Sequence, residues 1–356
     1  MAETLILRPI SDASSEHRKS SGSNAYSLIN EASQDGDTTY IYQLVDSTSK
    51  VTKNTVCKVG GTAPNKLYYV TQSVATVVGK VNDTSTSSTK EVIVAIRTDP
   101  SGSDFNRTTT SCKTTTYTEY STGNSSIGRG YYEAGTIPDL WILASTSGNK
   151  GTSKSSNKEI RITQAYITLT IIDAYRCAAI AIGGCTASVS DTLSAGASRT
   201  WTATVQDGYA FAGWMDQENY QKYWNGESYS VISSDLTYDS GSISKDMTLY
   251  ACAYRTDPPV ISVVSQDAVK VSGQTSKNRC SVKFNCDQRI VDFEARAQKT
   301  ANADWSGRNG VIVEDGEPLD VNDEGWVYVD YNELTNGDGQ YDVKIFGRNE
   351  GGVWSE

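Results

Sequence analysis

The chain has 356 residues and a net charge of −10, with 32 Lys and Arg against 42 Asp and Glu. A chain of this length commonly folds as two or three domains, each able to bury its own core. The negative charge, with no Lys/Arg cluster interleaved with aromatic residues, argues against a nucleic-acid partner.

Residues 1–172 read as short strands separated by clusters of turn residues. Alternation is clearest in 159–172, where the apolar positions have a period near two. These positions are Ile160, Ile162, Ala165 or Tyr166, Ile167, Leu169 and Ile171. About eight strands over this length predict an antiparallel two-sheet sandwich of jelly-roll type.

Two further units follow along the chain. Residues 173–255 contain strands joined by Gly- and Asp-based turns, which predicts a small β module. Pro258 and Pro259 mark its boundary, because a double proline cannot lie in the middle of a sheet. The strand spacing in 256–356 suits an immunoglobulin- or fibronectin-like sandwich. We therefore predict an all-β protein of serial modules, in which only residues 329–343 indicate a helical turn.

Signals for membranes and export are missing from the sequence. No apolar run reaches the roughly 18 residues of a spanning helix, and the longest candidate begins at Ala178. At the N-terminus the apolar run is broken at once by Arg8 and Pro9, which is unlike a secretory signal. We expect synthesis in the cytoplasm without a signal peptide, and no membrane partner.

The seven cysteines include no CxxC pair, so the sequence predicts no metal cluster. A chain made in a reducing cytoplasm keeps its thiols free, as small buried hydrophobic groups, and we favour this state. The alternative, after release into an oxidising exterior, is pairing of Cys177 with Cys185 or Cys252, and of Cys280 with Cys286.

Catalytic chemistry finds little support. The only histidine, His17, lies in a Ser-rich loop, which excludes paired-His zinc sites and makes a Ser/His/Asp relay a poor hypothesis. Asp35 and Asp37 flank a glycine but lack the further ligands of a calcium loop. No carboxylate pair is identifiable as a hydrolytic site. We therefore predict no catalytic residues, no metal and no cofactor.

Aromatic residues cluster between 214 and 224. Trp214 follows a Phe-Ala-Gly segment and is expected in the core. Tyr220, Tyr223 and Trp224 belong to a segment that we expect to be a loop. Because Trp and Tyr rings stack on sugar rings, these three are the candidate ligand-binding residues.

The middle unit carries a Gly-Tyr-x-Phe-x-Gly-Trp pattern. Its residues are Gly208, Tyr209, Phe211, Gly213 and Trp214. With the Gly pair at 183–184 and the segment 246–253, the pattern resembles the divergent internalin-type B repeat, a small β-grasp-like module of bacterial surface proteins. Only one copy is present, and Cys252 and Ala253 stand where the repeat has its closing aromatic residue.

Segments 5–17, 26–43, 137–146 and 159–171 look like the N-terminal sandwich of tailed-bacteriophage virion proteins, including head-decoration and fibre-type components. Segment 327–355 is similar to the immunoglobulin-like domains appended to such proteins. The resemblance implies a non-enzymatic protein on the virion surface. It would decorate the outer capsid through residues 1–172, bind the major capsid protein or other virion proteins, and assemble as a symmetric homo-oligomer such as a trimer.

Two other functions stay open. The first is a phage tail adhesin that recognises host-surface glycans through loops and aromatic residues. The second, with less support in the sequence, is a carbohydrate-active enzyme, which would need a carboxylate pair in a cleft.

Overall fold

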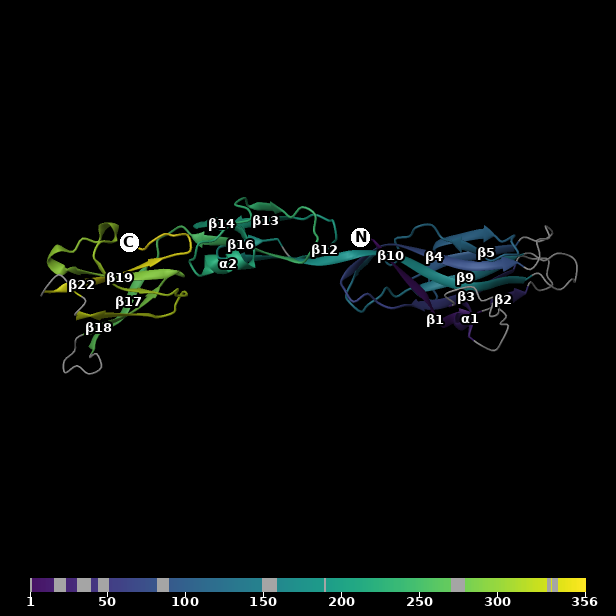
Figure 1. The fold of residues 1–356 in the computed structure, drawn as a ribbon, viewed down its shortest axis with the longest axis horizontal. Coiled ribbons are helices and arrows are strands. Elements are labelled where there is room, and N and C mark those ends of the chain that lie inside the picture. Colours follow the sequence, from purple (N-terminus) through teal and green to yellow (C-terminus); the bar gives the residue numbers. More distant parts are fainter. Residues whose placement is uncertain are drawn as a thin grey trace, which may run out of the picture. The chain divides into compact units, whose positions relative to one another are not determined.

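The computed structural model describes residues 2–15, 24–30, 40–43, 51–81, 90–148, 159–188, 190–269, 279–331, 334 and 339–356. It confirms an all-β fold of serial sheet modules (Figure 1). The chain divides into two compact units. The first comprises 1–175, 192–197 and 243–245, and the second contains the rest. The first predicted boundary, at 172/173, lies close to Tyr175. The second, at 255/256, falls inside the second unit, so the separate domains 173–255 and 256–356 stay a prediction.

The first unit is built from two antiparallel sheets that share strand β1. In one sheet, β10 pairs with β1, β2 and β4, and β4 pairs with β7 and β8. In the other, the order is β1, β3, β9, β5, β6. β1 passes from one sheet to the other near Pro9, where its register shifts. The elements are β1 Glu3–Ser15, α1 Ala25–Ile29, β2 Tyr40–Gln43, β3 Val51–Gly60, β4 Tyr68–Val81, β5 Lys90–Arg97, β6 Phe105–Ser111, β7 Thr118–Ser121, β8 Gly130–Tyr132, β9 Trp141–Gly148 and β10 Glu159–Ile182.

The core of this unit confirms the alternation seen in the sequence. Ile167, Leu169 and Ile171 on β10 are buried in one cluster with Val77 and Ala75 of β4. Their neighbours in the sequence point to the other face, as the two-residue period of a strand requires. β10 extends beyond the predicted 159–172 to Ile182, and its residues after Tyr175 belong to the second unit.

The middle segment has a three-stranded sheet and, apart from it, two strands that continue the sheet of β10. β11, β13 and β15 form the sheet, while β16 pairs antiparallel with β14 and parallel with the end of β10. Trp214 is fully buried and donates its Nε1–H to the Asp235 carbonyl at 3.1 Å, which confirms its expected core position. The elements are β11 Cys185–Ala187, β12 Asp191–Ser194, β13 Thr200–Val205, β14 Tyr209–Met215, α2 Gln217–Trp224, β15 Thr237–Asp239 and β16 Met247–Arg255.

Beyond Pro259 the chain forms a sandwich of two three-stranded antiparallel sheets, ordered β17-β18-β21 and β20-β19-β22. Figure 1 labels β17 and β18 in one sheet and β19 and β22 in the other. Phe284 and Phe293 meet edge to face in its core, with ring centroids 5.0 Å apart. The elements are β17 Ile261–Val269, β18 Arg279–Cys286, β19 Asp292–Lys299, η1 Thr300–Asn302, η2 Ser306–Arg308, β20 Val311–Gly316, β21 Gly325–Asp330 and β22 Tyr341–Arg348. Of the predicted helical turn at 329–343, residues 332, 333 and 335–338 lie outside the described residues.

All seven cysteine thiols are free in the structure, six of them buried and Cys280 half-buried. In the described part of the chain, no helix has the length and apolar character needed to cross a membrane.

Candidate functional site: an aromatic joint and an open groove in the second unit

The segment that carries the three candidate aromatic residues is a helix, α2, where we expected a loop. Asp216 caps its N-terminus, because its Oδ1 accepts the Asn219 backbone N–H at 2.8 Å. That hydrogen bond also holds the pKa of the Asp216 carboxyl below its usual range. One turn further on, Lys222 pairs with Glu218 at 2.7 Å. The cap and the ion pair together explain why a segment rich in Asn, Gln and Tyr is helical.

Two of the three candidate residues pack inside the middle segment. The Tyr223 side chain is only 1% exposed, and its hydroxyl donates to the Ala253 carbonyl at 3.2 Å. Burial raises the pKa of Tyr223 far above its usual range. Tyr220 lies flat on Tyr250, with centroids 4.3 Å apart and planes 3° from parallel. These contacts give both rings a structural partner within the protein.

Trp224 is covered by an arginine from the C-terminal sandwich. The guanidinium carbon of Arg289 lies 3.8 Å from the centroid of the Trp224 ring, and its Nη2 donates to the Trp224 carbonyl at 2.6 Å. Arg289 also pairs with Asp320 at 2.5 Å and approaches Glu350 at 3.4 Å. A planar guanidinium suits this combination of stacking and forked hydrogen bonding, which a lysine could not make.

Other close contacts surround this stack. The fully buried Asn349 donates its side-chain N–H to the Arg255 carbonyl at 2.8 Å. Gly226 has a φ of +73°, and a Cβ there would lie 2.6 Å from Val291. A Cβ on Gly351 would overlap the Tyr254 ring. We call this set of contacts the aromatic joint, since it joins the middle segment to the C-terminal sandwich.

Sequence reasoning missed Arg289 and Asn349, two polar residues of the joint. Arg289 lies 65 positions from Trp224, and no local pattern reports a contact at that separation. The sequence predicts Trp224 as a ligand-binding ring, and in the structure the Arg289 guanidinium lies over that ring.

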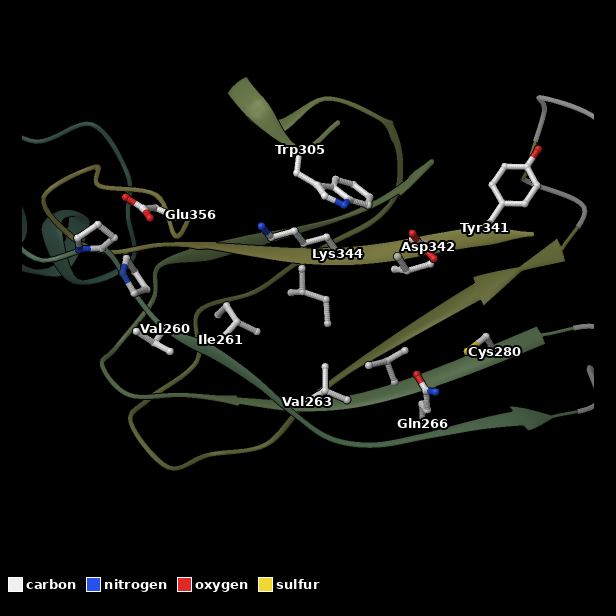
Figure 2. Close-up of a pocket in the computed structure, with 15 residues that line it drawn as sticks. Val260, Ile261, Val263, Gln266, Cys280, Trp305, Tyr341, Asp342, Lys344 and Glu356 are labelled. Carbon is white, nitrogen blue, oxygen red and sulfur yellow. The ribbon is translucent and has the colours of Figure 1, made fainter. Parts of the chain in front are cut away.

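The second feature is a groove of about 950 Å³ in the C-terminal sandwich (Figure 2). It opens between β17 and β22, the outer strands of the two facing sheets. Its apolar lining residues are Val260, Ile261, Val263, Val282, Val343 and Ile345. A further hollow of about 750 Å³ shares Gln266, Cys280, Tyr341 and Val343 with it, and so continues it along the strands.

Charged groups border the groove on the side of β22. Figure 2 shows Trp305, Lys344 and Asp342 on the side of β22, and Val260, Ile261 and Val263 on the side of β17. Glu356 stands at one end, near the two prolines. A groove with an apolar floor and few charges is suited to hold an apolar segment rather than an ion.

Reactive groups are scarce in the described residues, where no three His, Cys, Asp or Glu side chains come together as a metal site. Burial raises the pKa of the Cys252 thiol to about 12. It also holds the pKa of Cys280, at the groove, above its usual value. Such thiols stay protonated at neutral pH and are poor nucleophiles. His17, Asp35 and Asp37 lie outside the described residues.

No family model matches the chain, and no curated protein matches it in sequence. Three solved structures resemble parts of it. A family 16 carbohydrate-binding module has 11% identity over 39% of this chain and 82% of that one, with a TM-score of 0.19. An arabinose-bound GH51 α-L-arabinofuranosidase has 13% identity over 46% of this chain and 23% of its own, with a TM-score of 0.23. Tripeptidyl peptidase 2 has 8% identity over 88% of this chain and 21% of its own, with a TM-score of 0.18. Scores this low carry no argument about fold or function.

Proposed function

We propose that this chain is a non-enzymatic structural protein of a tailed-phage particle that decorates the outer capsid surface. In this proposal the first unit docks on the major capsid protein or another virion protein. The second unit then presents its modules to the surroundings. The resemblance of segments 5–17 and 159–171 to virion sandwiches supports docking through the first unit.

The aromatic joint is the observation that carries the proposal. Arg289 stacks on Trp224 at 3.8 Å and holds its carbonyl, while Asn349 bonds across to Arg255. Trp224, one of the candidate ligand-binding rings, here packs against Arg289 of the C-terminal sandwich. That packing suits a presenting arm on a particle, whose task is to hold its modules in a constant orientation.

Docking on a symmetric shell would need only modest contacts at each site. The first unit exposes Ile6, Ile10, Phe105 and Tyr131, each at least 40% accessible. Apolar side chains of this kind provide area for an interface. If the protein is a homo-oligomer, simultaneous attachment at several lattice sites would multiply weak single contacts.

A truncation tests which unit docks. Removing residues 256–356 keeps every residue of the first unit, including 192–197 and 243–245. We expect the truncated protein, once circular dichroism shows that it is folded, to co-sediment with purified particles that lack the protein as well as the full chain does. Loss of binding in this folded fragment would argue against docking by the first unit.

A glycan-binding adhesin is the second candidate, favoured by a pair of rings away from Trp224. Trp326 and Tyr328 on β21 are 45% and 43% exposed, with planes 8° from parallel and centroids 6.1 Å apart. Lys283 lies 5.5 Å from the Trp326 centroid, and Arg279 lies 5.7 Å from that of Tyr328. An adhesin that uses these rings would lose cell binding in Trp326→Ala while its attachment to particles stayed unchanged.

A further inference from the structure

The chain after β22 turns back and begins a new strand beside it. The Asn349 N–H donates to the Val353 carbonyl at 3.0 Å, and the Ser355 N–H donates to the Gly347 carbonyl at 2.8 Å. Arg348 and Trp354 form an antiparallel bridge between these two bonds. The outer edge of β22 is therefore covered near Gly347 by residues 353–355.

Further along β22 the same edge is uncovered. Backbone groups of a strand point alternately to its two sides. The Arg348 carbonyl accepts the Val291 N–H at 2.7 Å, so even-numbered residues bond toward β19. Gly347 bonds outward to Ser355, so Ile345 and Val343 also face outward. No described residue pairs with the backbone of these two residues on that side.

The hydrophobic core opens at this uncovered edge. Val282 and Ile345 belong to the core of the sandwich and also line the groove. Across the groove Val260 and Val263 are 58% and 59% exposed. On the opposite side of the sandwich, the carboxylate of Glu314 on β20 accepts the Tyr328 N–H of β21 and so bridges the two sheets. On the β22 side, by contrast, the core residues Val282 and Ile345 line a groove that runs beside an unpaired strand edge.

We infer that the groove accepts an extended segment of a partner polypeptide as an added strand, antiparallel to β22. The pairing of Arg348 with Trp354 shows which backbone groups of β22 point outward, toward such a segment. The incoming residues that bond to Ile345 and Val343 point their side chains into the groove, because directly opposed residues share a face of the sheet. The partner segment therefore has about five residues, apolar at alternate positions and polar between them.

The occupant must be a segment that is not already part of a folded sheet. If a second copy paired through the same edge of its own sandwich, the inward side chains of that edge, such as Ile345, would already be buried in its own core. They cannot also fill this groove. An extended, otherwise unstructured segment has side chains free to enter it, so we assign a partner polypeptide rather than a second copy.

The first test is a titration of the full chain with a synthetic peptide of alternating Thr and Val residues, followed by calorimetry. We expect saturable binding. N-methylation of the Val residues, whose N–H groups face β22, should weaken binding at least about tenfold. N-methylation of the Thr residues, whose N–H groups face away, should change it little. Equal effects of the two methylations would contradict pairing with β22.

Two variants on one strand locate the site. Val263 lines the groove, whereas Val264, 48% exposed on the same strand, does not. Val263→Lys should reduce peptide binding about tenfold or more, and Val264→Lys should leave it unchanged. If the chain instead dimerises in sedimentation and Val263→Lys dissociates the dimer, a second copy occupies the groove and the assignment to a partner polypeptide is wrong.

Attaching the strand covalently to the chain distinguishes a site that binds the free peptide too weakly to detect from the absence of any site. Appending Val-Thr-Val-Thr-Val after Glu356 continues the register with Val opposite the outward-bonding residues of β22. It should raise the melting temperature by about 5 °C. The matched Thr-Val-Thr-Val-Thr extension puts Thr into the groove and should give no such rise. Equal melting temperatures, together with no peptide binding, would overturn the inference.

Discussion

Arg289 is the residue on which the aromatic joint depends. Its side chain is only 12% exposed, and it meets the Trp224 ring, the Trp224 carbonyl, Asp320 and Glu350 together. Burial raises the pKa of Glu350, while the charge of Arg289 opposes that rise. Removing the arginine would therefore leave a buried carboxyl without its cation, as well as an unstacked ring.

We predict that Arg289→Ala lowers the free energy of unfolding of the second unit by about 2–4 kcal/mol. Arg289→Lys should recover only part of this loss, because an ammonium cannot stack and fork its bonds as a guanidinium does. The measurement is urea unfolding followed by tryptophan fluorescence. Arg199→Ala is the control, since Arg199 and Asp191 form an exposed pair that should contribute less than about 1 kcal/mol. An equal decrease in the free energy of unfolding in the two alanine variants would contradict the stabilising role of Arg289 in the aromatic joint.

The buried thiol of Cys252 makes a prediction about alkaline pH. Burial raises its pKa from 9.0 to about 12 in the folded protein. Between these values the unfolded thiol loses its proton and the folded one keeps it, so stability falls as the pH rises. The loss is about 1.4 kcal/mol per pH unit for one such group.

In Cys252→Ala this contribution disappears. The free energy of unfolding at pH 7 should fall modestly, because packing is lost. Between pH 9 and 11, however, the free energy of unfolding should decrease less steeply with pH than in the parent protein. Thermal unfolding of both proteins at several pH values between 9 and 11 measures this difference. An unchanged slope would mean that Cys252 does not contribute to the pH dependence.

At the scale of elements, α2 depends on its cap. Asp216→Ala removes the acceptor for the Asn219 N–H and should cost about 1 kcal/mol. The control Glu218→Ala breaks only the exposed pair with Lys222 and should cost less than about 0.5 kcal/mol. Because the pKa of Asp216 is lowered on folding, its contribution is present at neutral pH and is lost as the pH falls through that pKa. A difference between the parent and Asp216→Ala that persists in strong acid would contradict the capping role.

Strands of the first unit were the easiest elements to predict. Ile167, Leu169 and Ile171 alternate with polar neighbours, and alternation reports burial directly. Helix α2 was missed because its apolar residues are tyrosines and a tryptophan, which favour strands and binding loops as much as helices. The one sequence feature that indicates a helix here is Asp216, a residue type favoured at the N-cap position, and a single such residue is weak evidence.

The candidate site was much less predictable. Cation stacking of Arg289 on Trp224 joins residues 65 positions apart, and the groove exists only because two strand edges, β17 and β22, face each other. Both features depend on contacts between residues that are far apart in the sequence, so no local pattern predicts them. Exposed valines such as Val263 look the same in the sequence as valines of a closed core.

At the scale of the whole molecule, we propose that the first unit docks. The second unit would present the middle segment and the C-terminal sandwich, which the aromatic joint connects, together with the open groove. Limited proteolysis should cut Arg289→Ala faster between the middle segment and the C-terminal sandwich, near Pro258, than it cuts the parent. Identical cleavage would show that the joint does not restrain the modules. Electrophoresis of the fragments at timed intervals is the measurement.

The location of the chain on a phage particle tests the central claim most directly. A single-particle reconstruction of the particle that carries this protein should show its density on the outer surface of the head. Residues 1–175 should contact the shell, and residues 256–356 should lie away from it. Density at the tail tip, contact through residues 256–356, or particles that lack the chain altogether would contradict the proposed function.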